Sequence, residues 1–165
     1  MYKYKLYIIF LVSALTIIGA VGFYNQEKDI EEIYKKDLDA EIIDFKHLKT
    51  LSLRIEEVSP QEVIFSTKGS WIQFWNKYGE GEVPHVNFSQ SIIAGIFLGE
   101  KPSPGYGVEI VGIQKIENQT EIQFVEYLPN PDLGYAAVLV YPYDLVVFPK
   151  TEGRFTFHSF KEIKK

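Results

Sequence analysis

The chain of 165 residues contains no cysteine. Disulfide bonds, thiolate metal sites and lipid attachment at a cysteine are therefore all excluded. The stability of a folded part must come from its hydrophobic core alone. That is feasible, since about 140 residues bury roughly two-thirds of the surface that the unfolded chain exposes.

Basic residues are too few for a nucleic-acid partner. Residues 25–165 hold 15 of the 17 basic groups and all 22 acidic groups, so their formal charge is −7. Binding to a phosphate backbone requires a basic surface. We therefore expect no nucleic acid among the partners, and no adhesion of this part to anionic lipid headgroups.

The sequence lacks every short motif that carries catalytic chemistry. It has no HExxH helix and no GxSxG turn, and its histidines are far apart: His47, His85 and His158. The glycines of 105–107 precede a strand-like pattern and not a helix, so they do not form a phosphate loop. We expect no catalytic residue, no metal site and no cofactor. Paired carboxylates such as Glu56 and Glu57 leave a glycan-active enzyme as the least favoured alternative.

An apolar run lies near the N-terminus. Lys3 and Lys5 precede 18 uncharged residues, Leu6–Phe23. This length falls between the roughly 20 residues of a spanning helix and the about 7–15 of a signal-peptide core. We predict a signal anchor or a signal peptide over 1–24, with an uncleaved anchor favoured and cleavage left open.

The same run predicts where the chain is located. Lysines before it and acidic residues after it place the N-terminus in the cytoplasm. The chain is then anchored in the membrane or secreted, and its domain lies on the extracytoplasmic side. Residues 25–41 follow as an amphipathic linker, because their apolar side chains have helical spacing: Ile30, Ile33, Tyr34 and Leu38. A solvated linker without fixed structure is an equal alternative.

Aromatic residues make up 15% of the chain, which favours strands. Alternation of apolar residues, or short apolar runs bounded by turn residues, predicts the following strands: one in 50–58, one after Pro60, one in 91–99, a hairpin of 106–116 with 120–128, one or two strands in 135–150, and an edge strand in 154–160. The apolar run 91–99 predicts a central strand covered on both faces.

One helix is predicted within this β-rich region. Four aromatic residues have the spacing i, i+3, i+4 and i+7 of a single helical face: Trp71, Phe74, Trp75 and Tyr78. Ser66 or Thr67 provides an N-cap and Gly79 an end. The aromatic face is predicted to pack on a sheet, and a stacking platform for sugars or a partner is the minority alternative.

Together these patterns predict an α+β domain over 42–160, followed by a solvated tail over 161–165. Short turns between successive strands favour antiparallel pairing, since parallel strands need long crossovers. The predicted fold is a mainly antiparallel β-sheet or barrel with one packed amphipathic helix.

The segment 99–106 combines prolines and glycines in one loop. Proline fixes φ and glycine permits close backbone approach, so such a loop is stiff and costs little entropy to bind. We predict a partner-binding loop made of Lys101, Pro102, Ser103, Pro104, Gly105 and Tyr106. A second predicted contact is the aromatic bend Tyr141, Pro142 and Tyr143. A plain connection between strands remains the alternative for the loop.

Four stretches together resemble one family: VIFSTKGSWIQFWNKYG, PHVNFSQSIIAGIFLGEKPSPGYGVEI, VEYLPNP and YPYDLVVFPK. They are similar to the C-terminal domain of the PrcB family of protease complex subunits over about residues 58–150. Its pattern has a helix with Trp, a P-x-V-D-F strand entry, an apolar strand ending G-x-K-P-x-G-G-Y, and a late Y-P-Y. This sequence departs from it at Asn87, where the pattern has Asp, and at Pro104, where it has a second Gly.

The resemblance implies an exported, membrane-associated bacterial protein with a non-catalytic role. The domain would bind or stabilise a protein partner, in the named case a secreted serine protease complex, and no catalytic residue carries over. The loop 101–106 also has the rhythm of the N-P-T-T-G-Y loop of chagasin-type protease inhibitors. That β-sandwich has no place for the helix at 68–78, so the inhibitor is the second hypothesis. The oligomeric state stays open.

Overall fold

The computed structural model describes residues 40–48 and 51–164. The predicted signal anchor over 1–24 and nearly all of the predicted linker over 25–41 lie outside these residues. No helix within the described residues has the length and apolar character of a membrane span. The fold described below belongs to the compact unit Ile42–Lys165.

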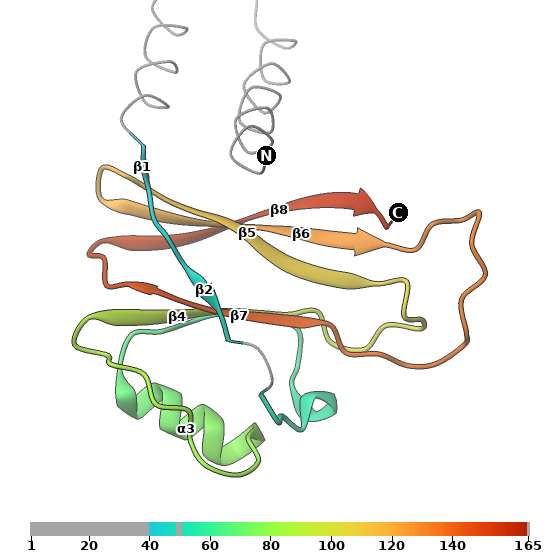
Figure 1. Cartoon of the computed structure of the whole chain (residues 1–165), viewed down its shortest axis with the longest axis horizontal. Helices are drawn as coiled ribbons and strands as arrows, with labels where there is room; N and C mark the ends of the chain where they lie inside the picture. Colours follow the sequence, from blue (N-terminus) through green and yellow to red (C-terminus); the bar gives the residue numbers. More distant parts are fainter. Residues whose placement is uncertain (1–39, 49–50, 165) are drawn as a thin grey trace, which may run out of the picture. The chain divides into compact units, whose positions relative to one another are not determined.

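Two four-stranded sheets and one helix form three successive layers (Figure 1). The first sheet has the order β1 (Glu41–Ile42), β5 (Gly107–Ile116), β6 (Gln119–Leu128) and β8 (Arg154–Ile163). The second sheet has the order β2 (Lys46–His47), β7 (Tyr143–Pro149), β4 (Ser91–Phe97) and β3 (Gln61–Phe65). Helix α3 (Lys68–Tyr78) covers the outer face of the second sheet.

The architecture confirms the predicted α+β class with mainly antiparallel strands and one helix. The predicted hairpin is present, with β5 antiparallel to β6 across a turn at Glu117 and Asn118. The strands form two separate sheets in the described chain, so of the two predicted alternatives, sheet and barrel, the sheet is correct.

Strand β4 lies at the centre of these layers, as predicted from its continuous apolar run. Successive side chains of a strand point to opposite faces. Ile92, Ala94 and Ile96 therefore enter the core between the two sheets, whereas Ile93 and Phe97 enter the core beneath the helix. Both faces are covered, which explains the absence of polar residues between Ile92 and Phe97.

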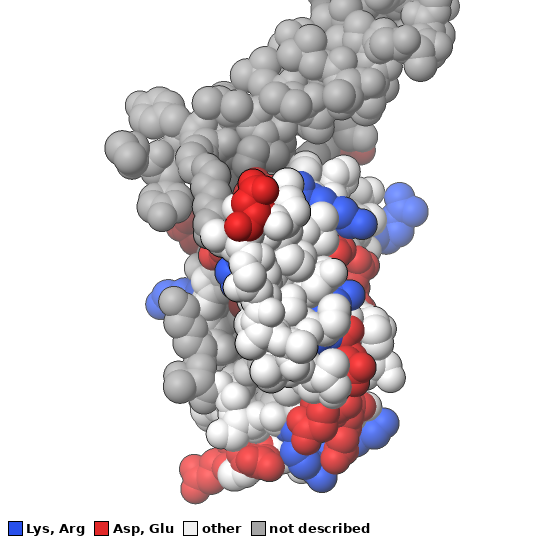
Figure 2. Space-filling model, turned by 90° about the vertical axis from the view of Figure 1, so that its right-hand side faces the viewer, with Lys and Arg blue, Asp and Glu red and all other residues white. Residues whose placement is uncertain are grey.

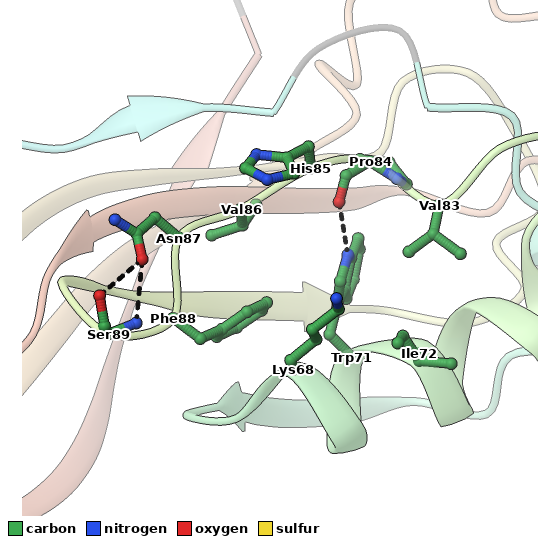
Figure 3. Close-up of a pocket in the computed structure, with 10 residues that line it drawn as sticks. All are labelled: Lys68, Trp71, Ile72, Val83, Pro84, His85, Val86, Asn87, Phe88 and Ser89. Carbon is green, nitrogen blue, oxygen red and sulfur yellow. Dashed lines mark hydrogen bonds between the residues drawn. The ribbon is translucent and has the colours of Figure 1, made fainter.

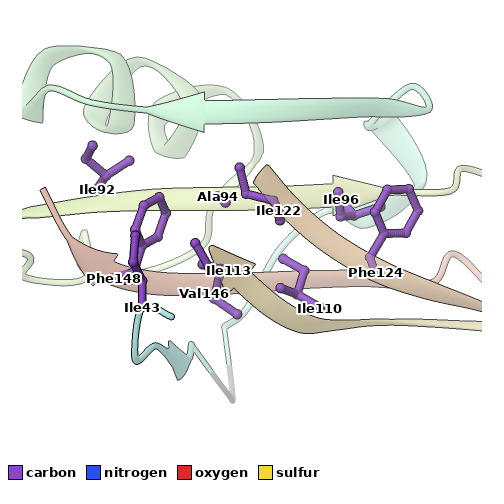
Figure 4. Packing of buried hydrophobic residues seen from close by; sticks show 10 residues of the cluster. All are labelled: Ile43, Ile92, Ala94, Ile96, Ile110, Ile113, Ile122, Phe124, Val146 and Phe148. Carbon is purple, nitrogen blue, oxygen red and sulfur yellow. The ribbon is translucent and has the colours of Figure 1, made fainter. Parts of the chain in front are cut away.

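The core between the sheets is built almost entirely from aliphatic side chains. Figure 4 shows its buried members: Ile43, Ile92, Ala94, Ile96, Ile110, Ile113, Ile122, Phe124, Val146 and Phe148. They come from both sheets, so burying them holds the two sheets together at roughly 25 cal/mol per Å² of apolar surface removed from water.

Helix α3 begins and ends at the residues that the sequence predicts. The Oγ1 atom of Thr67 accepts a hydrogen bond from the backbone N–H of Ser70 at 3.1 Å, as an N-cap does. The backbone N–H of Gly79 donates to the carbonyl of Trp75 and closes the last turn. The helix buries Trp71, Phe74 and Trp75, so the prediction that its aromatic face is core is confirmed.

A carboxylate between the sheets was not found from the sequence. Asp144 lies on β7 of the second sheet, and its Oδ2 accepts from the backbone N–H of Ile110 on β5 of the first sheet at 2.7 Å. The pairing of β5 with β6 shifts register between Ile110 and Gly112, so this N–H lies at a bulge. The second oxygen of Asp144 contacts Nδ1 of His47 at 3.0 Å. One side chain therefore joins β2, β5 and β7.

One predicted strand is wrong. Of the segment 50–58, the described residues 51–58 form the short 3-10 helix η2 (Ile55–Glu57) and one isolated bridge between Leu53 and Gly79, and no strand. Its alternating apolar residues pack under α3 without a neighbouring strand to pair with. Of the one or two strands predicted in 135–150, the structure has one, β7 at 143–149, and the segment 135–140 is irregular apart from a bridge at Val140.

Strand β8 corrects the sequence analysis in two ways. It pairs in parallel with β6, because β7 crosses to the other sheet and returns and so supplies the long crossover. It also extends to Ile163, where the residue is still in register with Leu128. The predicted tail over 161–165 is therefore strand as far as Ile163, although the prediction that β8 lies at an edge is confirmed.

Candidate interaction surface

The two segments predicted to bind a partner are each joined to one of two paired strands, β4 and β7. β4 ends at Phe97 and β7 begins at Tyr143, and these residues are partners in the sheet. The loop 98–106 that leaves β4 and the segment 129–142 that enters β7 therefore begin side by side. Figure 1 shows both at the same end of the sheets, to the right.

Hydrogen bonds join the two segments along their length. The N–H of Leu98 donates to the carbonyl of Pro142 at 2.9 Å, and Lys101 and Val140 exchange two backbone hydrogen bonds of 2.8 and 2.9 Å. The hydroxyl of Tyr141 donates to Oε2 of Glu100 at 3.0 Å. The predicted loop and the predicted bend thus form one surface, which we call the joined-loop surface and define as residues 98–106 and 129–142.

Two glycines of the loop 98–106 permit close contacts, Gly99 with Pro60 and Gly105 with the segment 129–142. Gly99 has φ of 66°, in the left-handed region that favours glycine, and a Cβ atom there would lie 2.6 Å from Cγ of Pro60. Gly105 is buried, and a Cβ atom there would lie 2.8 Å from Cβ of Pro129 and 3.0 Å from Cε1 of Tyr135. Gly105 therefore lets the two segments touch.

The six residues predicted in the loop have different environments. Pro102 and Pro104 are exposed, whereas Lys101, Ser103 and Tyr106 are half-buried. The ammonium of Lys101 lies 6.0 Å from the centre of the Tyr106 ring. The two prolines therefore carry most of what a partner could contact on this loop.

The turn at residues 103–106 of the loop is held by one hydrogen bond within the loop and by one from Lys164. The carbonyl of Ser103 accepts from the N–H of Tyr106 at 3.3 Å, and that of Pro104 accepts from Nζ of Lys164 at 3.0 Å. Pro104, which departs from the family pattern, lies in this turn and is tolerated there.

The three residues of the predicted bend do not act together. Tyr141 faces Glu100 on the joined-loop surface. Tyr143 instead stacks on Phe97, with ring centres 5.9 Å apart, and its hydroxyl donates to the carbonyl of Leu51. Burial raises the pKa of Tyr143. Tyr143 is thus part of the core beneath α3, and Tyr141 is the aromatic residue available to a partner.

The largest exposed apolar side chains of this surface were missed by the sequence analysis. Leu133, Val138 and Leu139 are 51%, 57% and 55% exposed. Residues 129–142 contain one charged residue, Asp132. Figure 2 faces this end of the domain and shows a broad uncharged area with charged groups along its borders. The apolar stretch YAAVLV, residues 135–140, was visible in the sequence, but an apolar run of this length is equally typical of a buried strand.

A separate pocket of about 500 Å³ lies between α3 and the segment that follows it. Figure 3 shows Lys68, Trp71 and Ile72 of the helix on one side and residues 83–89 on the other. The indole N–H of Trp71 donates to the carbonyl of Pro84 at 3.2 Å across the pocket. This pocket is apart from the joined-loop surface in the chain and shares no residue with it.

Asn87 stands where the resembled pattern has Asp, and its side chain forms a turn before β4. Its Oδ1 accepts from the N–H and the hydroxyl of Ser89, at 3.2 and 2.7 Å. Asp and Asn side chains both supply such an acceptor at the start of a turn. An Asp at this position could accept the same two hydrogen bonds.

The hydrogen bond between the two loops predicts a measurable titration. The Glu100 carboxylate that accepts from Tyr141 raises the pKa of that phenol above its ordinary value of 10.0. Because the folded pKa is raised, the stabilisation is fully present below pH 10 and is lost as the pH rises through the folded value. We expect NMR of tyrosine Cζ to show Tyr141 titrating late, and Glu100→Ala to lower its pKa. An unchanged pKa in Glu100→Ala would contradict this link.

No three His, Asp or Glu side chains gather to form a possible metal site in the part of the chain that the structure describes.

The comparison with protein families gave a match of residues 92–149 to the family described as PrcB C-terminal. This confirms the resemblance for β4 to β7, a range that contains the whole joined-loop surface. Neither the curated proteins nor the solved structures gave a match.

Proposed function

We propose that this chain, whose residues 92–149 match the PrcB C-terminal family, is a non-catalytic subunit that binds a protein partner through its joined-loop surface. The observation that carries the proposal is that two segments far apart in sequence are fixed together there and expose Leu133, Val138 and Leu139. Exposed apolar side chains that gather at one place are typical of interaction sites.

The fixed backbone supports binding at low entropic cost. Hydrogen bonds at Leu98, Lys101 and Tyr141 hold the loops before a partner arrives. Prolines at 102 and 104 restrict the loop further. A surface that is already ordered loses little conformational freedom on association, so more of the contact energy appears as affinity.

The proposed partner is a secreted protease, and the proposed location is the extracytoplasmic side of a membrane. The family resemblance supports the protease, and the apolar run Leu6–Phe23 supports export. The charged residues of the joined-loop surface are Glu100, Lys101 and Asp132, so a partner with an apolar centre and flanks of mixed charge would fit.

The test compares matched charge insertions in the full chain. Leu139→Asp places a carboxylate within the joined-loop surface, and Val83→Asp places one on an exposed apolar residue beside the pocket. Tagged full chains recovered from native cells are treated with a fluorophosphonate probe, which labels serine proteases. We expect a labelled partner with the wild type and with Val83→Asp, and at least about a tenfold loss with Leu139→Asp, which corresponds to about 1.4 kcal/mol.

Two outcomes would count against the proposal. Equal recovery of every partner with both variants would remove the joined-loop surface from the interaction. A partner lost with Leu139→Asp but never labelled by the probe would retain the surface and remove the serine protease.

A further inference from the structure

Strand β8 has one edge that is not paired within the described residues. It is the last strand of its sheet, and its other edge pairs with β6. The N–H groups of Arg154 and Lys164 donate to β6-side carbonyls, those of Asn118 and Leu128. Because backbone groups alternate along a strand, even-numbered residues of β8 face β6 and odd-numbered residues from 155 to 163 face away.

This edge carries charged side chains, Lys161 among them, but lacks the other features that normally prevent pairing. Edge strands are usually short, or carry proline, a bulge or charged side chains. β8 is 10 residues long and contains no proline or glycine, and its register with β6 is continuous from Arg154 to Ile163. A row of free donors and acceptors of this length is a template for a further strand.

We infer that the occupant is β8 of a second copy of the chain, antiparallel and centred on His158. A twofold axis at His158 pairs residues whose numbers lie equally far before and after it. Arg154 of each copy then lies opposite Glu162 of the other, so opposite charges face each other twice. Neither side chain has an ion-pair partner in the described chain, where the pairs formed are His47–Asp144 and Arg54–Glu57.

Neighbouring registers fit less well. Centring on Phe157 would place Arg154 opposite Phe160 and leave Lys161 to Ile163 beyond the paired strand. Centring on Ser159 would place Arg154 opposite Lys164, and like charges directly opposite each other destabilise a sheet. The register centred on His158 thus places Arg154 opposite Glu162 and still pairs nine residues of each strand, 154–162.

The uncharged side chains also fit this register. The rings of His158 and Phe160 lie on the same face, with centres 4.8 Å apart. In the dimer Thr156 lies opposite Phe160, an aromatic and β-branched pair of the kind that stabilises antiparallel strands. His158, Thr156 and Phe160 form pairs without backbone hydrogen bonds, in which side chains are closest.

This dimer goes beyond the proposed function, because it leaves the joined-loop surface free. Lys164 follows β8 and contacts Pro104, so β8 ends beside that surface. Antiparallel pairing about His158 therefore places the two joined-loop surfaces at opposite ends of the dimer. One dimer could hold two partner molecules.

The register is tested with single cysteines, since the chain has none of its own. In the full chain in mild detergent, His158→Cys lies opposite itself at a Cα separation of about 4.5 Å, within the range that a disulfide bridges. Thr156→Cys or Phe160→Cys alone is about 13 Å from its own copy. We expect oxidation to crosslink His158→Cys, and to crosslink a mixture of Thr156→Cys with Phe160→Cys but neither alone.

A charge exchange provides the second measurement. On the His158→Cys chain, Arg154→Glu or Glu162→Arg is expected to lower the crosslinked yield at low concentration about tenfold or more, and both together are expected to restore it. Crosslinking of His158→Cys no greater than that of Thr156→Cys would overturn the dimer. So would a double variant as weak as the single ones. Neither result depends on Leu139, so these experiments can disprove the dimer without disproving the proposed binding of a partner at the joined-loop surface.

Discussion

Replacing Trp71 with alanine is expected to lower the free energy of unfolding by roughly 3–5 kcal/mol, the usual cost of deleting a buried large aromatic side chain. Trp71 is 1% exposed. Its ring lies edge-on to Phe65, with ring centres 5.2 Å apart, and is stacked on Phe74, with ring centres 5.8 Å apart. Its loss also leaves the carbonyl of Pro84 without its indole donor. Helix, second sheet and pocket wall are all weakened by this one change.

Urea unfolding of a fragment of residues 40–165, followed by circular dichroism, measures this effect. Lys68→Ala in the same helix is the control, since an exposed substitution usually changes stability by less than about 0.5 kcal/mol. A loss below about 1 kcal/mol for Trp71→Ala would show that α3 is not packed on the second sheet as described.

Gly105→Ala is expected to weaken partner binding strongly while the fold is retained. The added methyl group would lie 2.8 Å from Cβ of Pro129, so the loop 98–106 must move away from the segment 129–142. Such overpacking costs about 1–3 kcal/mol, which a domain of this size can tolerate. The separated loops would no longer present one surface, and we expect affinity for the partner to fall at least about tenfold.

Gly134→Ala is the matched control. It changes a glycine of the same surface, and a Cβ atom there meets nothing within 4 Å. Affinity measured by titration calorimetry with the partner should be nearly unchanged in this variant. Equal affinities for the two variants would mean that the contact between the loops does not matter for binding.

Features with a local cause were predictable from the sequence. The helix 68–78 has a capping Thr67 and aromatic residues at helical spacing, and it forms as expected. The run from Ile92 to Phe97 has no polar residue, and it is buried on both faces. In both cases each residue preference agrees with the tertiary structure, which is the condition under which sequence patterns succeed.

Features that depend on distant partners were not predictable. The apolar pattern of 50–58 indicates a strand, but no neighbouring strand is available to pair with it, and a strand is defined by that pairing. Asp144 appears in the sequence as one more acidic residue, and its role needs the bulge at Ile110, 34 residues away. The parallel pairing of β8 with β6 likewise depends on β7 joining the other sheet.

The two segments of the candidate site were predictable from local features, but their pairing with each other was not. Proline and glycine marked the loop 99–106 as stiff, and the aromatic residues marked the bend at 141–143. Nothing local indicates that Lys101 pairs with Val140, or that Leu139 is exposed. The surface depends on that pairing, which the register of Phe97 with Tyr143 makes possible.

The most direct test of the joined-loop surface is site-specific photocrosslinking in the native cell. A photoreactive amino acid replaces Leu139 in one full chain and Val83 in another. The account predicts a crosslinked protein partner from position 139 and none of the same mass from position 83. The same partner crosslinked equally from both positions, or none from position 139 in cells where the partner co-purifies with the chain, would contradict it.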